Sequence, residues 1–129
     1  MSRVISYAMT SGNENEWHFL VKLATALKIW KYSDPFHREG KIFFECHIGK
    51  GIVVDVCTNG FPKMAIEIGF KYGNKYLERL KQLKNLGFKI ILVISKKTYK
   101  PLKLMKYIDE IWYSEELIQL LYQHLLKYI

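Results

Sequence analysis

The sequence predicts an α/β domain in which a mixed central sheet is flanked by helices. Apolar residues recur at helical spacing near the N-terminus, three short strand patterns follow, and a second helical pattern leads into a buried strand. A chain of 129 residues, 50% hydrophobic and 15% aromatic, suits one packed core. We therefore expect a single domain over residues 1–129.

An amphipathic helix is predicted over residues 13–31. Ser11 or Asn13 is available to cap its start, and Pro35 ends it, because proline disfavours a helical conformation in the residue before it. The apolar positions of this helix are spaced by three and four: Trp17, Phe19, Leu20, Leu23, Ala24, Leu27 and Trp30.

Three short strands that form an antiparallel meander are predicted next. The tight-turn sequences GKG, at 49–51, and TNG, at 58–60, separate them. The three strands span residues 41–48, 51–58 and 62–69.

Helical spacing returns over residues 73–86, and Gly87 supplies the usual C-terminal stop. A buried strand is predicted over residues 89–95. The order is then α-β-β-β-α-β, followed by a short helix, a short strand and a last helix, at residues 101–107, 110–113 and 115–127.

The charge of the chain indicates a polyanionic partner. The formal net charge is +8, and residues 71–106 carry eleven basic side chains against a single acid, Glu78. Each phosphate that Lys or Arg neutralises releases condensed counterions, so nucleic acid is the expected partner. A lysine-rich composition that serves no partner is the alternative. We expect no membrane segment or signal peptide, since the longest apolar runs, such as residues 90–94, are far shorter than a membrane helix, and therefore a cytoplasmic protein.

The cysteines and histidines are assigned no chemistry. Cys46 and Cys57 are predicted to be reduced packing residues, as is usual in the cytoplasm, with a disulfide between them as the alternative. A zinc site that adds His37 and His47 is not expected, because adjacent strand residues point to opposite faces. The remaining histidines are interpreted as surface or packing residues: His18, His37 and His124.

Two acids interrupt otherwise apolar strands. Asp55 lies within IVVDVC and Glu67 within MAIEIGF. A carboxylate in a buried strand is costly, so a functional role is favoured, with a position facing water as the alternative. Glu16, at the start of the first helix, is also a candidate, although the helix dipole alone favours an acid there.

These residues resemble the PD-(D/E)xK nuclease superfamily, whose fold is restriction-endonuclease-like. The resemblance covers roughly residues 13–95 and is carried by GIVVDVCTNGFPKMAIEIGFK, at 51–71, and EWHFLVKL, at 16–23. The family has the same αβββαβ core, with an acid on the second strand, acid-x-lysine on the third, and often a glutamate on the first helix. Val54 replaces the motif proline, and Gly69 replaces the motif lysine.

The resemblance implies metal-dependent hydrolysis of DNA by a Mg²⁺ or Mn²⁺ ion. Asp55, Glu67 and the backbone carbonyl of Ile68 would be the metal ligands, with Glu16 as an auxiliary acid. Lys71 is proposed as the displaced lysine, because residues 67, 69 and 71 share one face of an extended strand. A homodimer is expected, since cutting two strands needs two active sites.

The hairpin between the acids provides a structural test. A two-residue turn at 59–60 would pair residue 55 with 64 and place the acids on opposite faces. A three-residue loop at 58–60 would pair 55 with 63 and place them on one face. The nuclease hypothesis therefore predicts the three-residue loop.

Two other functions remain open. Lys75, Arg79 and Gln82 are predicted to contact phosphates, or else they form a solvated helix face. If the missing lysine has abolished catalysis, the domain is a nucleic-acid-binding module. The third hypothesis is a protein-interaction domain that uses its leucine-rich last helix: Leu117, Leu120, Leu121 and Leu125.

Overall fold

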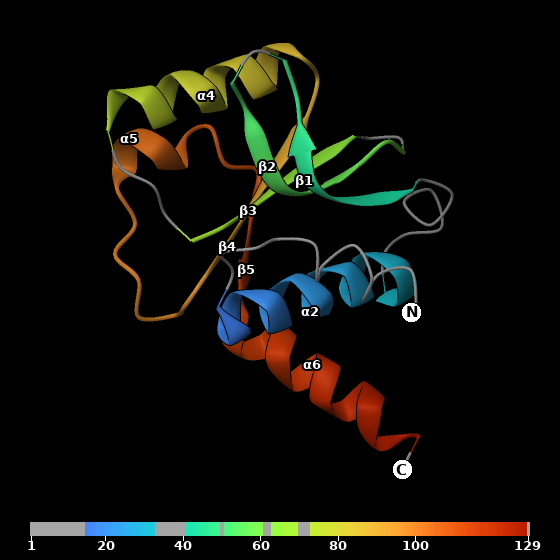
Figure 1. Ribbon diagram of the computed structural model, residues 1–129. Coiled ribbons are helices and arrows are strands. Elements are labelled where there is room, and N and C mark those ends of the chain that lie inside the picture. The colour runs from blue at the N-terminus through green and yellow to red at the C-terminus, as the bar shows by residue number, and fades with distance from the viewer. Residues whose placement is uncertain (1–14, 33–40, 50, 61–62, 70–72, 129) are drawn as a thin grey trace.

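The computed structural model describes residues 15–32, 41–49, 51–60, 63–69 and 73–128 (Figure 1). These residues form one five-stranded mixed sheet with helices on both faces, which confirms the predicted fold class. Within the described residues, no helix is long and apolar enough to cross a membrane. The elements in chain order are α2 (Glu16–Tyr32), β1 (Ile42–His47), β2 (Val53–Thr58), β3 (Met64–Ile68), α4 (Asn74–Asn85), β4 (Lys89–Ile94), α5 (Leu102–Met105), β5 (Glu110–Tyr113) and α6 (Ser114–Leu126).

The sheet has the simple order β1-β2-β3-β4-β5. The first three strands form the predicted antiparallel meander, and β3, β4 and β5 run parallel. Parallel neighbouring strands need a crossover connection. Helix α4 lies in the connection from β3 to β4, and α5 lies in the connection from β4 to β5. The carboxyl ends of three strands therefore meet at one edge of the sheet.

Each face of the sheet has its own apolar core. Figure 1 shows α2 and α6 together on one face and α4 with α5 on the other. On the first face Leu27 and Leu117 pack with the strand residues Ile66 and Val93. The core of the second face includes Leu80, Leu83, Val54, Ala65 and Ile90. Burial on both sides explains why β3 and β4 are almost continuously apolar.

Helix α2 begins later than its apolar pattern indicated. The side-chain Oδ1 of Asn15 accepts the backbone N–H of His18 at 2.7 Å, so Asn15 is the N-cap. The proposal of Ser11 or Asn13 as the cap is therefore wrong, and both lie outside the described residues. His18 and Lys22 are four residues apart in this helix and therefore lie one turn apart on one side of it.

The prediction of reduced cysteines is also wrong. Cys46 and Cys57 form a disulfide with a Cα–Cα distance of 6.3 Å, within the usual range for such bonds. Cys57 pairs with Phe43 in the strand register, three residues from Cys46. Glu45 has a φ of 50°, and this bend in β1 allows Cys46 to approach Cys57. Nothing in the local pattern of β1 indicated the bend.

Reducing this disulfide should lower the free energy of unfolding by about 2–3 kcal/mol. The bond closes a short loop, with a sequence separation of 11, and short loops give moderate entropic stabilisation. Urea unfolding with and without a phosphine reductant measures the effect. The Cys46→Ala/Cys57→Ala protein serves as the control, and its urea midpoint should be the same with and without the reductant. Equal urea midpoints for the oxidised and fully reduced wild type would contradict this expectation.

Candidate functional site

The strand register places the two buried acids side by side. Val56 pairs with Ile66 and Cys57 with Ala65, and extending this register by one residue aligns Asp55 with Glu67. The predicted three-residue loop is wrong, because β2 ends at Thr58 and β3 begins only at Met64. The nuclease hypothesis requires both acids on one face of the sheet, and this register also places them on one face.

Asp55 joins β2 to β3 through its side chain. Its Oδ2 accepts the backbone N–H of Ile68 at 2.8 Å, where a main-chain carbonyl would be the usual acceptor. Asp55 is only 8% exposed. The metal contact predicted for Ile68 involves its backbone carbonyl oxygen, whereas the hydrogen bond to Asp55 uses its backbone N–H. The Oδ1 atom of Asp55 is left for other partners.

Glu67 is fully buried and faces Arg79 of α4. The Arg79 guanidinium donates to the Glu67 carboxylate and to the backbone carbonyl of Val53. Arg79 thus lies against the sheet, whereas Lys75 and Gln82 on the same helix are exposed. Of the three predicted phosphate contacts, the structure brings one into the acid site and leaves two on the surface.

Tyr76 completes this side of the site, one turn of α4 before Arg79. Burial raises the pKa of its hydroxyl, the negative charge of Glu67 raises it further, the nearby Arg79 lowers it, and Asp55 adds a smaller rise. The hydroxyl is buried without a hydrogen-bond partner among the described residues. It therefore stays protonated and is a donor beside two carboxylates.

His18 of α2 also lies near Asp55. Its Nε2 lies 3.7 Å from Asp55 Oδ1, and its side chain is 29% exposed. His18 is thus partly exposed, as predicted for a surface or packing residue, and the structure adds this contact to Asp55. Glu16, the acid predicted for this helix, is exposed at its first turn. His18 is therefore the member of α2 that reaches the acid pair.

A third acid extends the pair across the sheet. Glu45 lies level with Asp55, because its neighbours Phe44 and Cys46 pair with Val56 and Val54. Its carboxylate contacts Lys22, which is fully buried. We call the three acids Glu45, Asp55 and Glu67 the acid row. Each member faces a base from a helix, namely Lys22, His18 and Arg79 respectively.

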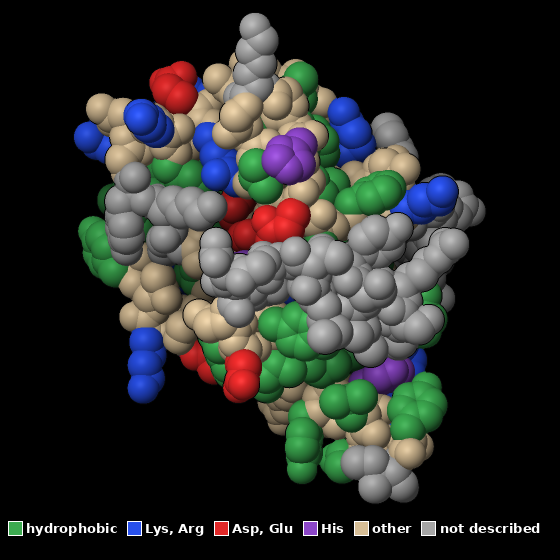
Figure 2. Space-filling model, in the orientation of Figure 1, with side chains coloured by type: hydrophobic (Ala, Val, Ile, Leu, Met, Phe, Trp, Pro, Cys, Tyr) green, Lys and Arg blue, Asp and Glu red, His purple; other side chains and the backbone are tan. Residues whose placement is uncertain are grey.

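Figure 2 shows acidic side chains gathered in the middle of one face of the molecule, with basic side chains and a histidine beside them. The sequence analysis missed Lys22 and His18, although both interrupt the buried side of an otherwise apolar helix. That pattern was the available signal. Glu45 had none, because its role depends on the bend in β1.

The position of the motif lysine is the weakest part of the resemblance. Strand β3 ends at Ile68, and Gly69 has a φ of 86°, outside the extended conformation. The shared strand face on which the proposal of Lys71 relied therefore stops at Ile68. Lys71 itself lies outside the described residues.

The described residues contain no group of three His, Cys, Asp or Glu side chains arranged to hold a metal ion. Two carboxylates, from Asp55 and Glu67, are nevertheless within one register position of each other. Magnesium keeps several water ligands and often takes only one or two carboxylates from a protein. Asp55 and Glu67 alone would leave most of the coordination shell of such an ion to water.

The comparisons with known proteins add no assignment. No protein-family model matches this sequence. A search of curated protein sequences also finds no match.

Proposed function

We propose that this domain is a divalent-metal-dependent nuclease that hydrolyses phosphodiester bonds in DNA. The observation that carries the proposal is the burial of two carboxylates, Asp55 on β2 and Glu67 on the neighbouring strand β3, in an α-β-β-β-α-β core. Two such acids are expensive to bury unless they bind a cation or a substrate. The net charge of +8 supports a polyanionic substrate.

Asp55 and Glu67 would hold a magnesium or manganese ion, which supplies an acidified attacking water and offsets charge that develops on the phosphate. The Arg79 guanidinium contacts Glu67, and rotation toward substrate would let it bind phosphate oxygens. His18, 3.7 Å from Asp55 and partly exposed, is placed to accept a proton at Nε2. This assignment provides a base in a chain that lacks the motif lysine.

The proposal also covers the cellular location and the oligomeric state of the protein. We place the protein in the cytoplasm as a homodimer, in which two sites serve the two strands of a duplex. Cys46 and Cys57 are only 8% and 9% exposed, and this burial would shield their disulfide from cytoplasmic reductants.

A catalytically inactive nucleic-acid-binding module is the second candidate. Gly69 in place of the motif lysine and the ion pair between Arg79 and Glu67 favour it. Such a module would bind DNA with strong salt dependence and never cut it. The third hypothesis was a protein-interaction domain that uses its leucine-rich last helix. Two of the leucines of that helix, Leu117 and Leu121, are instead buried in the core that α6 shares with α2.

The decisive experiment is incubation of labelled duplex, branched and single-stranded DNA with the wild-type protein in Mg²⁺, Mn²⁺ or EDTA. We expect cleavage with either metal and none in EDTA. Calcium provides a matched control, because it takes oxygen ligands but prefers a larger, more flexible coordination shell. Binding without cleavage on all three substrates, in both metals, would overturn the nuclease and favour the binding module.

A further inference from the structure

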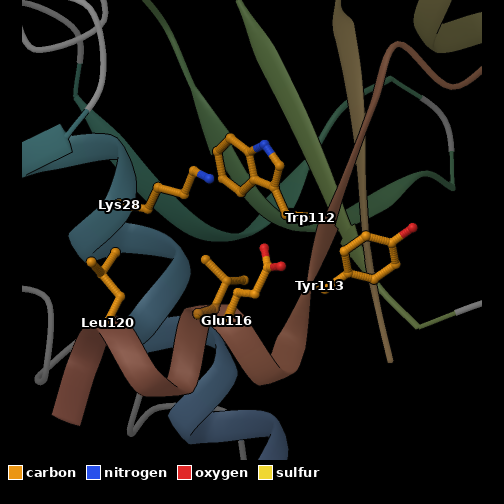
Figure 3. A pocket seen from close by; sticks show the side chains of 6 residues that line it. Lys28, Trp112, Tyr113, Glu116 and Leu120 are labelled. Carbon is orange, nitrogen blue, oxygen red and sulfur yellow. The ribbon is translucent and has the colours of Figure 1, made fainter. Parts of the chain in front are cut away.

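A pocket of about 180 Å³ lies between α2, β5 and α6, away from the acid row. Figure 3 shows the Trp112 ring, the Lys28 amine and the Glu116 carboxylate directed toward one space, with Leu120 across from the ring. Pockets for drug-sized ligands measure about 300–1,000 Å³, so this one has room for a single ring system. Its lining residues are Lys28, Trp112, Tyr113, Glu116, Leu117 and Leu120.

The lining combines a flat aromatic wall, apolar sides and two opposite charges. The Lys28 amine lies 4.6 Å from the centre of the Trp112 ring. Leu117 and Leu120 provide apolar contact, and the Glu116 carboxylate can accept hydrogen bonds from ring N–H or amino groups. A planar heterocycle with donor groups and an attached anion matches this combination. A nucleobase with its phosphate is such a ligand.

The strand register connects this pocket to the acid pair. Ile68 pairs with Val93, and Val93 pairs with Trp112, so Trp112 lies two strands away from Ile68 at the same edge of the sheet. Strands are about 4.8 Å apart, which places the two backbones roughly 10 Å apart. A stacked strand advances about 3.4 Å per nucleotide. Glu67 faces α4, whereas Ile68 and Trp112 pack on the side of α2 and α6, so a strand that joins the two sites would pass around the carboxyl end of β4.

Basic side chains lie between the two sites, in the connection that follows β4. Lys96 pairs with Glu116 at 3.2 Å and Lys100 donates to the Tyr113 hydroxyl at 2.7 Å. Because β4 lies between β3 and β5, these amines are positioned along the path from the acid pair to the pocket. They suit the phosphates of a strand that follows this edge.

We propose that the pocket receives one unpaired nucleobase of a DNA strand that continues around the carboxyl ends of the strands and places a phosphate at Asp55 and Glu67. The position of that phosphate rests on the proposed function, whereas base binding in the pocket does not. A base pair is too large for a cavity of this volume. The domain therefore selects single-stranded or branched DNA, in which a base is free to leave its stack, over blunt duplex.

The test is binding of a labelled single-stranded 12-nucleotide DNA in EDTA, measured by fluorescence anisotropy, with one abasic site moved through the sequence. For the wild type we expect one or two abasic positions to weaken binding about 5- to 150-fold, the loss of one base–aromatic stack. Trp112→Leu and Leu120→Trp, which respectively remove the wall and fill the pocket, should bind intact and abasic strands equally. Tyr99→Ala removes an exposed aromatic residue outside the pocket and should behave as the wild type.

Equal binding of every abasic strand by the wild type would overturn the pocket, as would failure to bind single-stranded DNA at all. Leu120→Trp retains the Trp112 side chain, so wild-type behaviour of this variant would also overturn it, even if Trp112→Leu fails to fold. The assay contains no metal and no cleavage. If the protein shows the abasic effect but never cuts DNA, the pocket proposal stands and the nuclease proposal fails. If it cuts DNA but shows no abasic effect, the nuclease proposal stands and the pocket proposal fails.

Discussion

Asp55→Asn and Glu67→Gln should each lower metal-dependent cleavage by more than about 100-fold. Residues that only support a metal ligand already contribute about 10- to 100-fold, and these two are the proposed ligands themselves. Both replacements retain an oxygen that accepts a hydrogen bond, so the contacts to Ile68 and Arg79 can persist. Initial rates of cleavage in Mg²⁺ at matched protein concentrations measure the effect.

Asp109→Asn is the matched control for Asp55→Asn. Asp109 accepts the backbone N–H of Ile90 at 2.7 Å, much as Asp55 accepts that of Ile68 at 2.8 Å, and it also contacts Lys84. It lies at the amino end of β4, at the opposite edge of the sheet from the carboxyl end of β3. This variant should cleave as the wild type does. Full activity in Asp55→Asn or Glu67→Gln would contradict the assignment of the acid pair.

Arg79→Met should lower the free energy of unfolding by about 3–5 kcal/mol, because it removes the guanidinium that faces a fully buried carboxylate. The double variant Arg79→Met/Glu67→Gln should recover much of this loss, since it also removes the buried charge. Urea unfolding of the wild type, both single variants and the double variant measures the coupling between the two residues.

Lys81→Met provides the comparison for Arg79→Met on the same helix. Lys81 forms an exposed i,i+3 ion pair with Glu78, and exposed pairs contribute only about 0–1 kcal/mol. Methionine also preserves the apolar stem at both positions. If Arg79→Met and Lys81→Met change stability equally, the buried ion pair does not stabilise the fold in the way its geometry indicates.

The elements of the fold were largely predictable from local patterns. The helix expected over 13–31 became α2 (Glu16–Tyr32), and the strand expected over 89–95 became β4 (Lys89–Ile94). Hydrophobic period and turn residues carry this information within a few positions of the chain. The cap of α2 was missed because three residues at alternate positions, Ser11, Asn13 and Asn15, satisfy the same local rule.

The candidate site was predictable only in part. Asp55 and Glu67 stood out as charges in apolar strands, and the parity of the register placed them on one face even though the predicted loop was wrong. His18 of α2 and Arg79 of α4 joined them because these two helices, distant in the chain, pack against the same sheet. That crossing depends on which helix covers which face, and no local pattern contains it.

The sequence by itself determined the order of the elements, the basic charge and the two unusual acids, because each follows from the side chains of a short segment. Only the tertiary structure decided which base faces each acid, the bend at Glu45 that joins Cys46 to Cys57, and the alignment of Ile68 with Trp112 across β4. These features arise between residues distant in the chain. Their free energies come from burial and packing that exist only once the sheet and both helical layers have formed.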